Sequence, residues 1–507
     1  MTVYKKIQYG LVEGVHEIPC QRANKLFQGI YQDYKYKFLF ESKDISPIYG
    51  RLSLLGVDPA LRITGKDDHF EIEALNPRGK YFLKQINKKD LQICDFYKKT
   101  ASKISGKIKC VHTNCEESQR SKQKNISQII RSILRKFKLE DRSYLGLYGA
   151  FSYDFVRLFE DISEKNPKNE VNDFDLFLYD TFIFFDHLKD RSEVIVFRQS
   201  KKEAEGAVKA LLKKITKKQE KEIKYSITDP NLTLSKNEYK KLVEIAQKYS
   251  KEGELFEVVF ANILKAHFAG EPYALYLRYS EVNPSPYLFF FDFGQEQLVG
   301  ASPEMMVRTE HGQVHMRPIS GTARRGNDPI EDHENMLSLL SDSKERAELD
   351  MLIDLGRNDL SRVCKPGVTI SDYRFVEKYS RVMHTVAHLT GELNEDCTAL
   401  DALIACLNAG TLTGTPKVAA MNAIEKHEKE RRGFYGGVIG YLTFSGEMDS
   451  GIIIRTAHIR GEELRFQVGA TLLYRSVPEK EFQETMHKAE AFIDTFANPI
   501  ITGKPYL

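Results

Sequence analysis

Hydrophobic residues follow two different patterns along the chain, and the two patterns predict different elements. Between residues 126 and 137 they recur three or four positions apart, which predicts one amphipathic helix. Elsewhere they form short apolar runs bounded by turn residues, which predict strands. In the first half these runs are 49–57, 70–75, 144–155 and 181–185.

The second half is richer in predicted hairpins. Runs 287–293 and 297–300 flank one glycine-containing turn, and runs 305–308 and 313–316 flank another. Between residues 436 and 473, three more runs are separated by turns at 445–447 and 460–462, which predicts an antiparallel meander. Large antiparallel sheets with inserted helices predict a layered α+β fold.

One segment separates the two halves. Residues 227–235 include Pro230, which interrupts the helical pattern, and end at Ser235, which can cap a helix starting at Lys236. We therefore predict an N-terminal portion over 1–235 and a second domain over 236–507.

Composition is that of a globular protein. The 507 residues are 42% hydrophobic and 29% charged, which is unlike a disordered chain, and no apolar run approaches the ~20 residues that span a bilayer. The first residues contain no signal-type apolar core, and the 7 cysteines are widely scattered, as in reduced proteins. We expect a cytoplasmic protein with no membrane segment.

Positive charge is concentrated, although the formal net charge is only +3. Residues 98–138 hold 12 Lys and Arg against 2 Glu, which could form a nucleic-acid surface. The helical pattern favours a solvated face instead, so we expect no nucleic-acid partner. The basic residues on that expected face are Arg131, Arg135, Lys136 and Lys138. Cys110, His112 and Cys115 lack a second ligand pair and do not predict a zinc site.

The first candidate for chemistry is a predicted helix over 341–354. Glu345 and Glu348 share a face with Leu352 and Leu355. Acids on an apolar stripe are costly to bury unless they bind a cation or donate protons from raised pKa values. An ion pair with Arg346 or a half-exposed position would also satisfy them.

The last helix offers a second acidic face. Residues 476–479 have the spacing of a capping box with a proline in the first turn. Glu481, Glu484 and Lys488 then share one face. Two such helices can hold a hard divalent ion such as Mg²⁺, and surface salt bridging is the alternative.

Two glycine-containing turns complete the candidates. In segment 318–326, Gly321 and Thr322 follow a strand, where backbone N–H groups and a hydroxyl can receive a carboxylate, although a plain basic turn fits equally well. Segment 410–417 lacks the spacing of a nucleotide P-loop and does not predict ATP binding.

Seven ordered segments together resemble the chorismate-utilising enzymes, and specifically component I of anthranilate synthase. The similarity is dense from about residue 236 to 498. The segments are 318–326, 344–348 with 354–359, 379–384, 410–417, 432–437, 449–455 and 469–473.

The resemblance implies a layered two-sheet α/β sandwich with an N-terminal regulatory portion and a chorismate site between the sheets. It implies Mg²⁺ held by Glu348 and Glu484, Glu345 as the general acid, and His384 beside the same part of the substrate. The implied substrate-binding residues are Gly321 and Thr322 on the ring-carboxylate side, Tyr435, Arg455 and Gly469 at the enolpyruvyl carboxylate, and Thr411 and Lys488.

The implied reaction is that of a lyase in tryptophan biosynthesis. Ammonia attacks the ring of chorismate with loss of water, and elimination of pyruvate then gives anthranilate. Ser320 stands where aminodeoxychorismate synthases have a nucleophilic lysine, and Glu257 where isochorismate synthases have a lysine base, so both of those activities are disfavoured.

Two alternatives stay open. Thr471 replaces a glycine of many anthranilate synthases, so the reaction could stop at 2-amino-2-deoxyisochorismate, which retains the enolpyruvyl group. A basic RNA-binding protein on an inert scaffold is the non-enzyme alternative, but an inert scaffold would not need the full set of site residues.

Two further elements resemble a feedback site for tryptophan. Residues 39–42, with Glu41 and Ser42, resemble one wall, and residues 283–288, with Pro286, Tyr287 and Leu288, resemble the second. By itself the first tetrapeptide is more often a strand end than a ligand site.

The cysteine contexts predict a partner. None of the 7 cysteines stands in the Gly-x-Cys-x-Gly elbow of a glutamine amidotransferase. We therefore expect a separate glutamine amidotransferase subunit to supply the ammonia.

Overall fold

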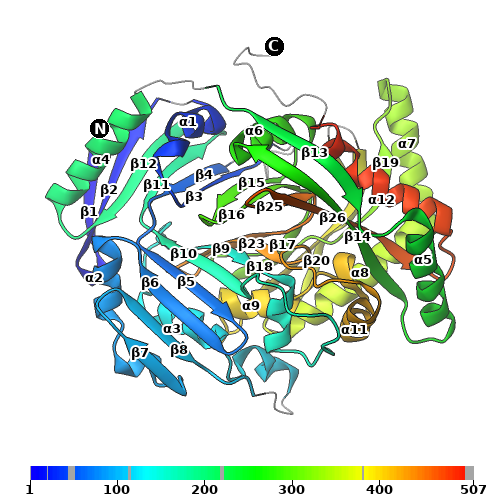
Figure 1. Ribbon diagram of the computed structural model, residues 1–507, viewed down its shortest axis with the longest axis horizontal. Helices are drawn as coiled ribbons and strands as arrows, with labels where there is room; N and C mark the ends of the chain where they lie inside the picture. The colour runs from blue at the N-terminus through cyan, green and yellow to red at the C-terminus, as the bar shows by residue number, and fades with distance from the viewer. Residues whose placement is uncertain are drawn as a thin grey trace.

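Two large antiparallel sheets face each other in the computed structural model (Figure 1). It describes residues 2–19, 21–43, 52–111, 116–216, 222–379 and 382–496. Sheet A, in spatial order, contains β1 (Thr2–Ile7), β2 (Leu11–Ile18), β12 (Arg191–Arg198), β11 (Thr181–Asp186), β4 (Leu52–Val57), β3 (Lys37–Glu41), β15 (Tyr287–Asp292), β16 (Glu296–Ser302), β25 (Thr456–Arg460), β26 (Glu463–Leu473), β14 (Glu257–Gly270) and β13 (Tyr225–Leu232), with β22 (Gly414–Thr415) on β14.

Sheet B has a similar size and also joins strands from both halves of the chain. The pairing within both sheets is antiparallel wherever the structure describes it, and the predicted two-sheet α+β fold is confirmed. Sheet B contains β19 (Ile319–Arg324), β21 (Val382–Glu392), β18 (Gln313–Met316), β17 (Met305–Glu310), β24 (Met448–Ile452), β23 (Val438–Thr443), β9 (Gly146–Phe151), β10 (Phe174–Tyr179), β5 (Leu61–Lys66), β6 (His69–Ala74), β8 (Lys103–Lys107) and β7 (Phe96–Lys99), with β20 (Thr369–Lys378) on β21.

Helices cover the sheets. Helices α4 and α12 pack on sheet A, and α8 packs on β19 and β21 of sheet B; α5 and α12 lie side by side (Figure 1). The helices are α1 (Ala23–Ile30), α2 (Pro77–Gln85), α3 (Ser127–Lys136), α4 (Lys201–Thr216), α5 (Lys236–Lys251), α6 (Pro272–Val282), α7 (Pro329–Ser341), α8 (Ser343–Ser361), α9 (Ala399–Cys406), α10 (Gly410–Thr413), α11 (Lys417–His427) and α12 (Pro478–Ile493).

The main core lies between the sheets and is rich in aromatic rings. Phe38 of sheet A stacks on Tyr148 of sheet B with ring centroids 5.0 Å apart, and on Phe291 at 5.6 Å. All three side chains are buried. Such rings exclude much water and fix the spacing of the two layers.

The two portions of the chain are joined within each sheet. In sheet A, Glu41 of β3 is opposite Leu288 of β15, and in sheet B, β9 pairs with β23. Helix α5 begins at Lys236, where Ser235 forms a reciprocal capping box with Glu238.

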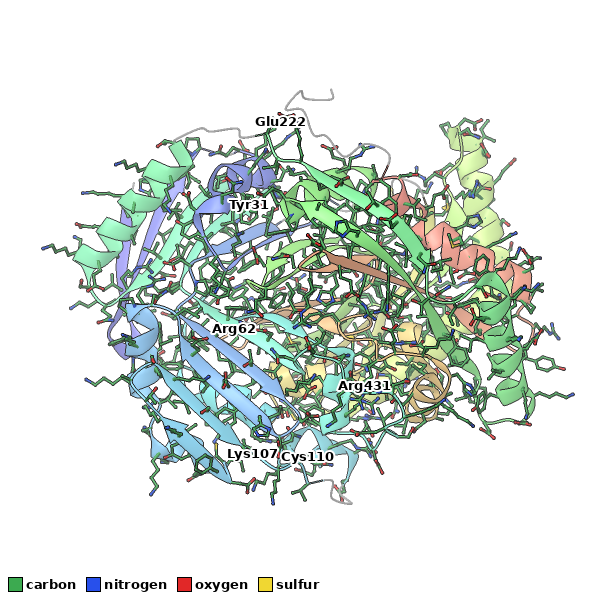
Figure 2. All side chains as sticks on the ribbon, in the orientation of Figure 1. Tyr31, Arg62, Lys107, Cys110, Glu222 and Arg431 are labelled. Atoms are coloured by element: carbon green, nitrogen blue, oxygen red, sulfur yellow. The ribbon has the colours of Figure 1, made fainter. Side chains whose placement is uncertain are left out.

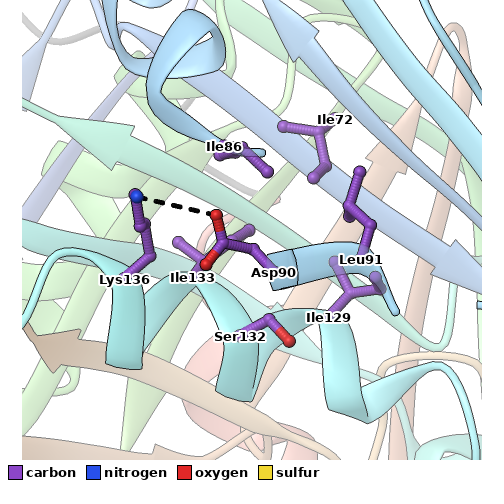
Figure 3. Close-up of a pocket in the computed structure, with 8 residues that line it drawn as sticks. All are labelled: Ile72, Ile86, Asp90, Leu91, Ile129, Ser132, Ile133 and Lys136. Carbon is purple, nitrogen blue, oxygen red and sulfur yellow. Dashed lines mark ion pairs between the residues drawn. The ribbon is translucent and has the colours of Figure 1, made fainter. Parts of the chain in front are cut away.

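The predicted helix over 126–137 is present as α3, but one of its basic residues is not solvated. Arg131 forms a bidentate ion pair with the buried Asp401 of α9, at 2.8 and 2.9 Å. This partner, distant in sequence, could not be inferred from the helical period. Figure 3 shows the other side of α3, where Ile129 and Ile133 pack on η3 (Lys88–Leu91) and Lys136 pairs with Asp90 at 3.6 Å.

Two helix starts differ from the predictions. The predicted helix over 341–354 is present as α8 but begins two residues later, at Ser343, because Asp342 ends α7 and caps α8 by accepting hydrogen bonds from the N–H groups of Lys344 and Glu345. The capping box at residue 476 is absent: α12 begins at Pro478 after Val477, and the Ser476 hydroxyl instead accepts from the Leu473 N–H at 2.9 Å.

The predicted three-stranded meander over 436–473 is wrong. It is two hairpins in different sheets, β23–β24 in sheet B and β25–β26 in sheet A. The chain crosses between them at residues 453–455, where Arg455 adopts a φ of +50°. A second crossing, from β16 to β17, passes through Pro303 and Glu304. Residues 49–51 of the first predicted strand, and His112 and Cys115, lie outside the described residues.

Candidate active site between the sheets

The two crossings lie side by side and carry polar side chains between the sheets. The Ile452 N–H donates to the Glu304 carbonyl at 3.0 Å, and the Ala301 N–H donates to the Arg455 carbonyl at 3.1 Å. A φ of +50° is costly for arginine and is maintained only where the surroundings impose it. The two crossings are therefore held in fixed positions relative to each other. Side chains of the helices converge on them.

Acidic side chains of α8 and α12 approach each other near these crossings. Burial raises the pKa of Glu345, opposed by Lys344, and the charges of Asp342 and Glu484 raise it further. Burial and the charge of Glu345 raise the pKa of Glu348 to about 7. These acids therefore share one electrostatic environment, as the spacing of the predicted helices suggested.

Glu484 differs from the other acids because it has a cationic partner. Burial opposes its ionisation, but Lys488 lies 2.8 Å away and lowers its pKa below the usual range. Lys488 also donates to the Gly469 carbonyl of β26 at 3.1 Å. It thereby links the acidic side of the site to the strand that carries Gly469.

A glycine turn at β19 contacts the acidic side. Gly321 has a φ of +70°, and a Cβ placed on it would lie 2.9 Å from a carboxylate oxygen of Glu345. His384 Nδ1 donates to the Gly321 carbonyl at 2.8 Å and lies 3.0 Å from the Thr322 hydroxyl. Because a carbonyl only accepts, the proton is on Nδ1 and Nε2 keeps its lone pair. Burial lowers the pKa of His384 to about 4, so the ring is neutral.

The opposite side of the site is formed by Tyr435, Gly469 and Arg455. A Cβ on Gly469 would lie 3.1 Å from the Tyr435 hydroxyl, so glycine permits this approach. Burial raises the pKa of Tyr435 to about 12, which keeps the phenol neutral. Burial lowers the pKa of Arg455, which forms no ion pair with any residue in the described part of the chain. A half-buried cation without an ion-pair partner in the described chain fits an anionic ligand group.

The sequence analysis missed Glu304, which lies on the first crossing. Its carboxylate is 8% exposed and accepts from the Thr411 hydroxyl at 3.0 and 3.1 Å. Burial raises its pKa to about 8. The sequence did contain a signal, because an acid directly between two apolar strand runs is costly to bury unless it has a function or a partner.

Glu257 is a further buried acid, at the start of β14. It is 1% exposed, and Thr415 donates to one of its oxygens at 3.4 Å, whereas the other oxygen has no partner among the described residues. Burial and the charge of Glu348 raise its pKa to about 8. Thr471 lies across from Val259 on the neighbouring strand.

The residues that the resemblance assigned to a chorismate site are thus linked by contacts or electrostatic interactions, with Thr411 joined to the others through Glu304, which interacts with Lys488. Three carboxylates, Glu345, Glu348 and Glu484, influence one another electrostatically, but no group of three His, Cys, Asp or Glu within the described ranges already has the geometry of a metal site. Carboxylate oxygens with raised pKa values are suitable ligands for a hard cation, whose charge would relieve their repulsion.

The two predicted walls of the second site also meet. Glu41 and Leu288 are cross-strand partners, and the Lys43 N–H donates to the Ser285 carbonyl at 3.1 Å. The Tyr276 hydroxyl of α6 donates to Glu41 at 2.5 Å. The Ser42 hydroxyl is buried without a partner in the described chain. Pro286 is buried, and the half-buried Tyr287 donates its hydroxyl to Asp449 of β24 in sheet B at 3.0 Å.

Among the described residues, no helix is long and apolar enough to cross a membrane.

Comparisons with known proteins agree with this geometry. The family profile described as chorismate binding enzyme matches residues 84–494. Anthranilate synthase component 1 of Aquifex aeolicus is 38% identical over 386 residues, 72% of this chain and 78% of that protein. The protein of the same name from Buchnera aphidicola subsp. Schizaphis graminum is 33% identical over 91% of this chain and 92% of its own length.

Solved structures show the same architecture. Anthranilate synthase component I from Streptococcus pneumoniae superimposes with a TM-score of 0.69 at 29% identity, covering 87% of this chain and 91% of that one. The menaquinone-specific isochorismate synthase of Escherichia coli shares the fold, with a TM-score of 0.68 at 18% identity over 97% of this chain and 96% of that one. The chain therefore belongs to the family of chorismate binding enzymes, as a homologue of anthranilate synthase component 1.

Proposed function

We propose that the chain is the large subunit of a magnesium-dependent anthranilate synthase. It would convert chorismate and ammonia into anthranilate and pyruvate, as a lyase of tryptophan biosynthesis. The observation that carries the proposal is that one site holds two kinds of charge: acids of α8 and α12 that repel one another, and Arg455, which forms no ion pair with a described residue. Chorismate carries two carboxylates, one for each side.

The ring carboxylate would lie on the acidic side with the metal. Glu348 and Glu484 would hold Mg²⁺, which when bound would polarise the ring carboxylate as a Lewis acid. Gly321 and Thr322 present a backbone turn and a hydroxyl next to Glu345, suited to the same carboxylate. Lys488 offsets the charge of Glu484 and holds it close to β26.

The enolpyruvyl carboxylate would lie against Arg455. Tyr435 and the backbone at Gly469 provide neutral donors close to this arginine. A charge-assisted bond to the guanidinium would be strong, because Arg455 forms no ion pair with a described residue and interacts with Glu484 only beyond ion-pair distance. Thr411, on the third side, already donates to Glu304.

Proton transfer requires an acid and a base. The ring hydroxyl leaves as water when ammonia attacks, which needs a proton from Glu345 or from Glu304; both carboxyl groups have raised pKa values. In the second half the ring loses a proton while the enolpyruvyl C–O bond breaks, so that pyruvate leaves and the ring becomes aromatic. His384, neutral with a free lone pair on Nε2, can accept a proton there.

Product identification is the direct test. The purified chain with chorismate, Mg²⁺ and ammonium should give fluorescent anthranilate and an equal amount of pyruvate. Accumulation of an amino-enolpyruvyl product without pyruvate would contradict the proposal and indicate synthesis of 2-amino-2-deoxyisochorismate.

A partner would supply the ammonia in the cell. The name of the relatives, component 1, implies a second component. We propose that it is a glutamine amidotransferase. The chain alone should use ammonium but not glutamine, and addition of the amidotransferase should confer glutamine-dependent synthesis. Glutamine-driven synthesis by the isolated chain would contradict a separate partner.

Tryptophan would regulate the enzyme at the second site. The carboxylate of Glu41 and the unpartnered hydroxyl of Ser42 can bind the amino-acid part of tryptophan, between the walls formed by Pro286, Tyr287 and Leu288. Helix α6 connects this site to the first, since Tyr276 binds Glu41 while Tyr279 on the same helix interacts electrostatically with Arg455.

We place the reaction in the cytoplasm. Cys94, Cys364, Cys397 and Cys406 are free thiols, as is typical of a reducing compartment.

A further inference from the structure

Arg432 lies next to Tyr435, on the proposed enolpyruvyl side of the site, and is 3% exposed. It forms a bidentate ion pair with Glu428, with Nη2 to Oε1 at 2.6 Å and Nε to Oε2 at 3.0 Å. Glu428 also accepts from the Ala261 N–H of β14 at 2.9 Å. The two side chains therefore hold each other, and Glu428 also anchors the pair to β14.

The remaining donors of Arg432 bind two backbone carbonyls on different elements. Nη1 donates to Leu412 at 2.6 Å, and Nη2 donates to Val259 at 2.7 Å. Leu412 directly follows Thr411 in α10, and a methyl of Val259 would lie 3.0 Å from a Cβ on Gly469. One planar group thus sets the spacing between α10 and β14.

Two aromatic rings lie against the same guanidinium. Its centre is 5.4 Å from the ring centroid of Tyr435 and 4.9 Å from that of Tyr153. Tyr153 belongs to η5 (Tyr153–Leu158) of the N-terminal portion, and its hydroxyl has no partner in the described chain, so the ring itself makes the contact. The orientation of Tyr435, whose hydroxyl reaches Gly469, is therefore coupled to Arg432.

We propose that Arg432 is a positioning residue for chorismate binding. It fixes Thr411, Tyr435 and the Val259–Gly469 contact relative to one another without touching the substrate. A buried ion pair is a weak source of stability, because well-packed apolar groups often do as well, whereas a planar five-donor group gives fixed geometry. The inference rests on the proposed function, in which Tyr435 and Gly469 bind the enolpyruvyl carboxylate.

The test compares two Arg→Lys variants of the full chain with ammonium as nitrogen source. Lysine keeps the charge but cannot hold a carboxylate and two carbonyls in one plane. In Arg432→Lys we expect the KM for chorismate to rise about tenfold or more, since small displacements of binding groups have large kinetic effects. The kcat per folded molecule should fall less than the KM rises.

Arg62→Lys is the matched control. Arg62 pairs with Asp175 through Nε and Nη2 at 3.0 and 2.6 Å and lies against the rings of Phe177 and Tyr36. Figure 2 shows Arg62 well apart from Arg431, the neighbour of Arg432. Its variant should lose thermal stability to a similar degree, with the KM for chorismate within about twofold of the wild type.

The outcomes separate the two levels of the argument. If both variants lose stability and neither changes KM, Arg432 is merely structural and the inference is overturned. If Arg432→Lys does not fold, Tyr153→Leu decides: an increase of severalfold in KM supports positioning, and an unchanged KM overturns it. A wild-type chain that does not convert chorismate would refute the proposed function instead.

Discussion

The two candidate sites differ in how they treat buried polar groups. At the Glu41 site the protein satisfies most of them itself: Tyr276 donates to Glu41, and the Lys43 ammonium donates to Ser280 at 3.1 Å. Between the sheets, in contrast, Arg455 forms no ion pair within the described chain, and Glu348 faces another acid. At the Glu41 site most polar groups bind other groups of the protein, whereas the site between the sheets leaves charges uncompensated.

This difference indicates different ways of binding. Uncompensated charges cost stability in the free protein but need no rearrangement when an oppositely charged ligand arrives, which is the preorganisation expected of a catalytic site. A site whose hydrogen bonds are internally satisfied must exchange some of them for bonds to the ligand. Binding there can therefore shift the elements that supplied the original bonds, as a regulatory site requires.

The largest expected effect is loss of the acids on α8 and α12. Glu348→Ala and Glu484→Ala should each lower Mg²⁺-dependent turnover by about 10³-fold, because each would remove a metal ligand and its electrostatic contribution. Both proteins should fold, since neither side chain forms part of the apolar core. The measurement is the initial rate against Mg²⁺ concentration, together with thermal unfolding.

Glu479→Ala is the control on the same helix. Glu479 pairs with Lys236 at 2.5 Å and Lys240 at 3.5 Å, on the side of α12 next to α5. It should retain the wild-type dependence on Mg²⁺. Equal activity in Glu348→Ala or Glu484→Ala would remove the metal assignment and leave these residues in ordinary ion pairing.

The second effect separates the two candidate acids. Glu345→Gln or Glu304→Gln should lower turnover by about 10²-fold or more, depending on which carboxyl group donates the proton, since glutamine keeps the shape but has no acidic proton. Glu304, with a pKa of about 8, is protonated below that pH. If it is the acid, kcat/KM in the wild type should fall above about pH 8.

The pH profile of the variants gives the decision. Loss of the alkaline limb in Glu304→Gln, with the limb retained in Glu345→Gln, would assign the acid to Glu304. The reverse pattern would assign it to Glu345, as the resemblance implies. Full activity in both variants would place the acid elsewhere.

These acids also show how far the sequence alone reaches. Local periodicity was sufficient for α3 and for the hairpins at 287–300 and 305–316, because hydrophobic spacing directly reflects which face is buried. It was also sufficient to place Glu345 with Glu348, and Glu484 with Lys488, on helix faces. That the two faces meet depends on tertiary packing, for which periodicity carries no signal.

The crossings between sheets are the clearest failure. Residues 448–459 have the apolar pattern of one strand, and the break at Arg455 comes from a left-handed backbone and from hydrogen bonds to the other crossing. Glu304 was missed for the same reason, since a single acid between two hairpins has no periodic pattern. The functional residues thus lie where local rules are broken.

The third prediction concerns the uncompensated cation. Arg455→Met should lower kcat/KM for chorismate by about 30-fold, the equivalent of one charge-assisted hydrogen bond. The same change should raise the free energy of unfolding by about 1 kcal/mol, because it removes a half-buried charge that forms no ion pair with a described residue. Steady-state kinetics and urea unfolding measure the two effects.

Arg157→Met is the contrasting variant. Arg157 pairs with Asp154 at 2.7 Å and with Glu425 at 2.6 Å, so its removal takes away the ion-pair partner of the buried Glu425 and should destabilise the protein. If Arg455→Met were destabilising to a similar degree, Arg455 would be compensated in the free protein, and the contrast between the two sites would fail.

The smallest effect is expected at the Glu41 site. Glu41→Gln keeps an acceptor for the Tyr276 hydroxyl but removes the negative charge that would pair with the ammonium of tryptophan, so the Kd for tryptophan should rise about tenfold. Calorimetric titration measures this directly, and inhibition of ammonium-dependent synthesis should weaken in parallel. Glu281→Gln, an exposed change on the helix that carries Tyr276, is the control. Unaltered tryptophan binding in Glu41→Gln would mean that the Glu41–Tyr276 pair is only structural. Weakened binding with unchanged maximal inhibition would place tryptophan at this site, and would mean that residues other than Glu41 couple its binding to inhibition.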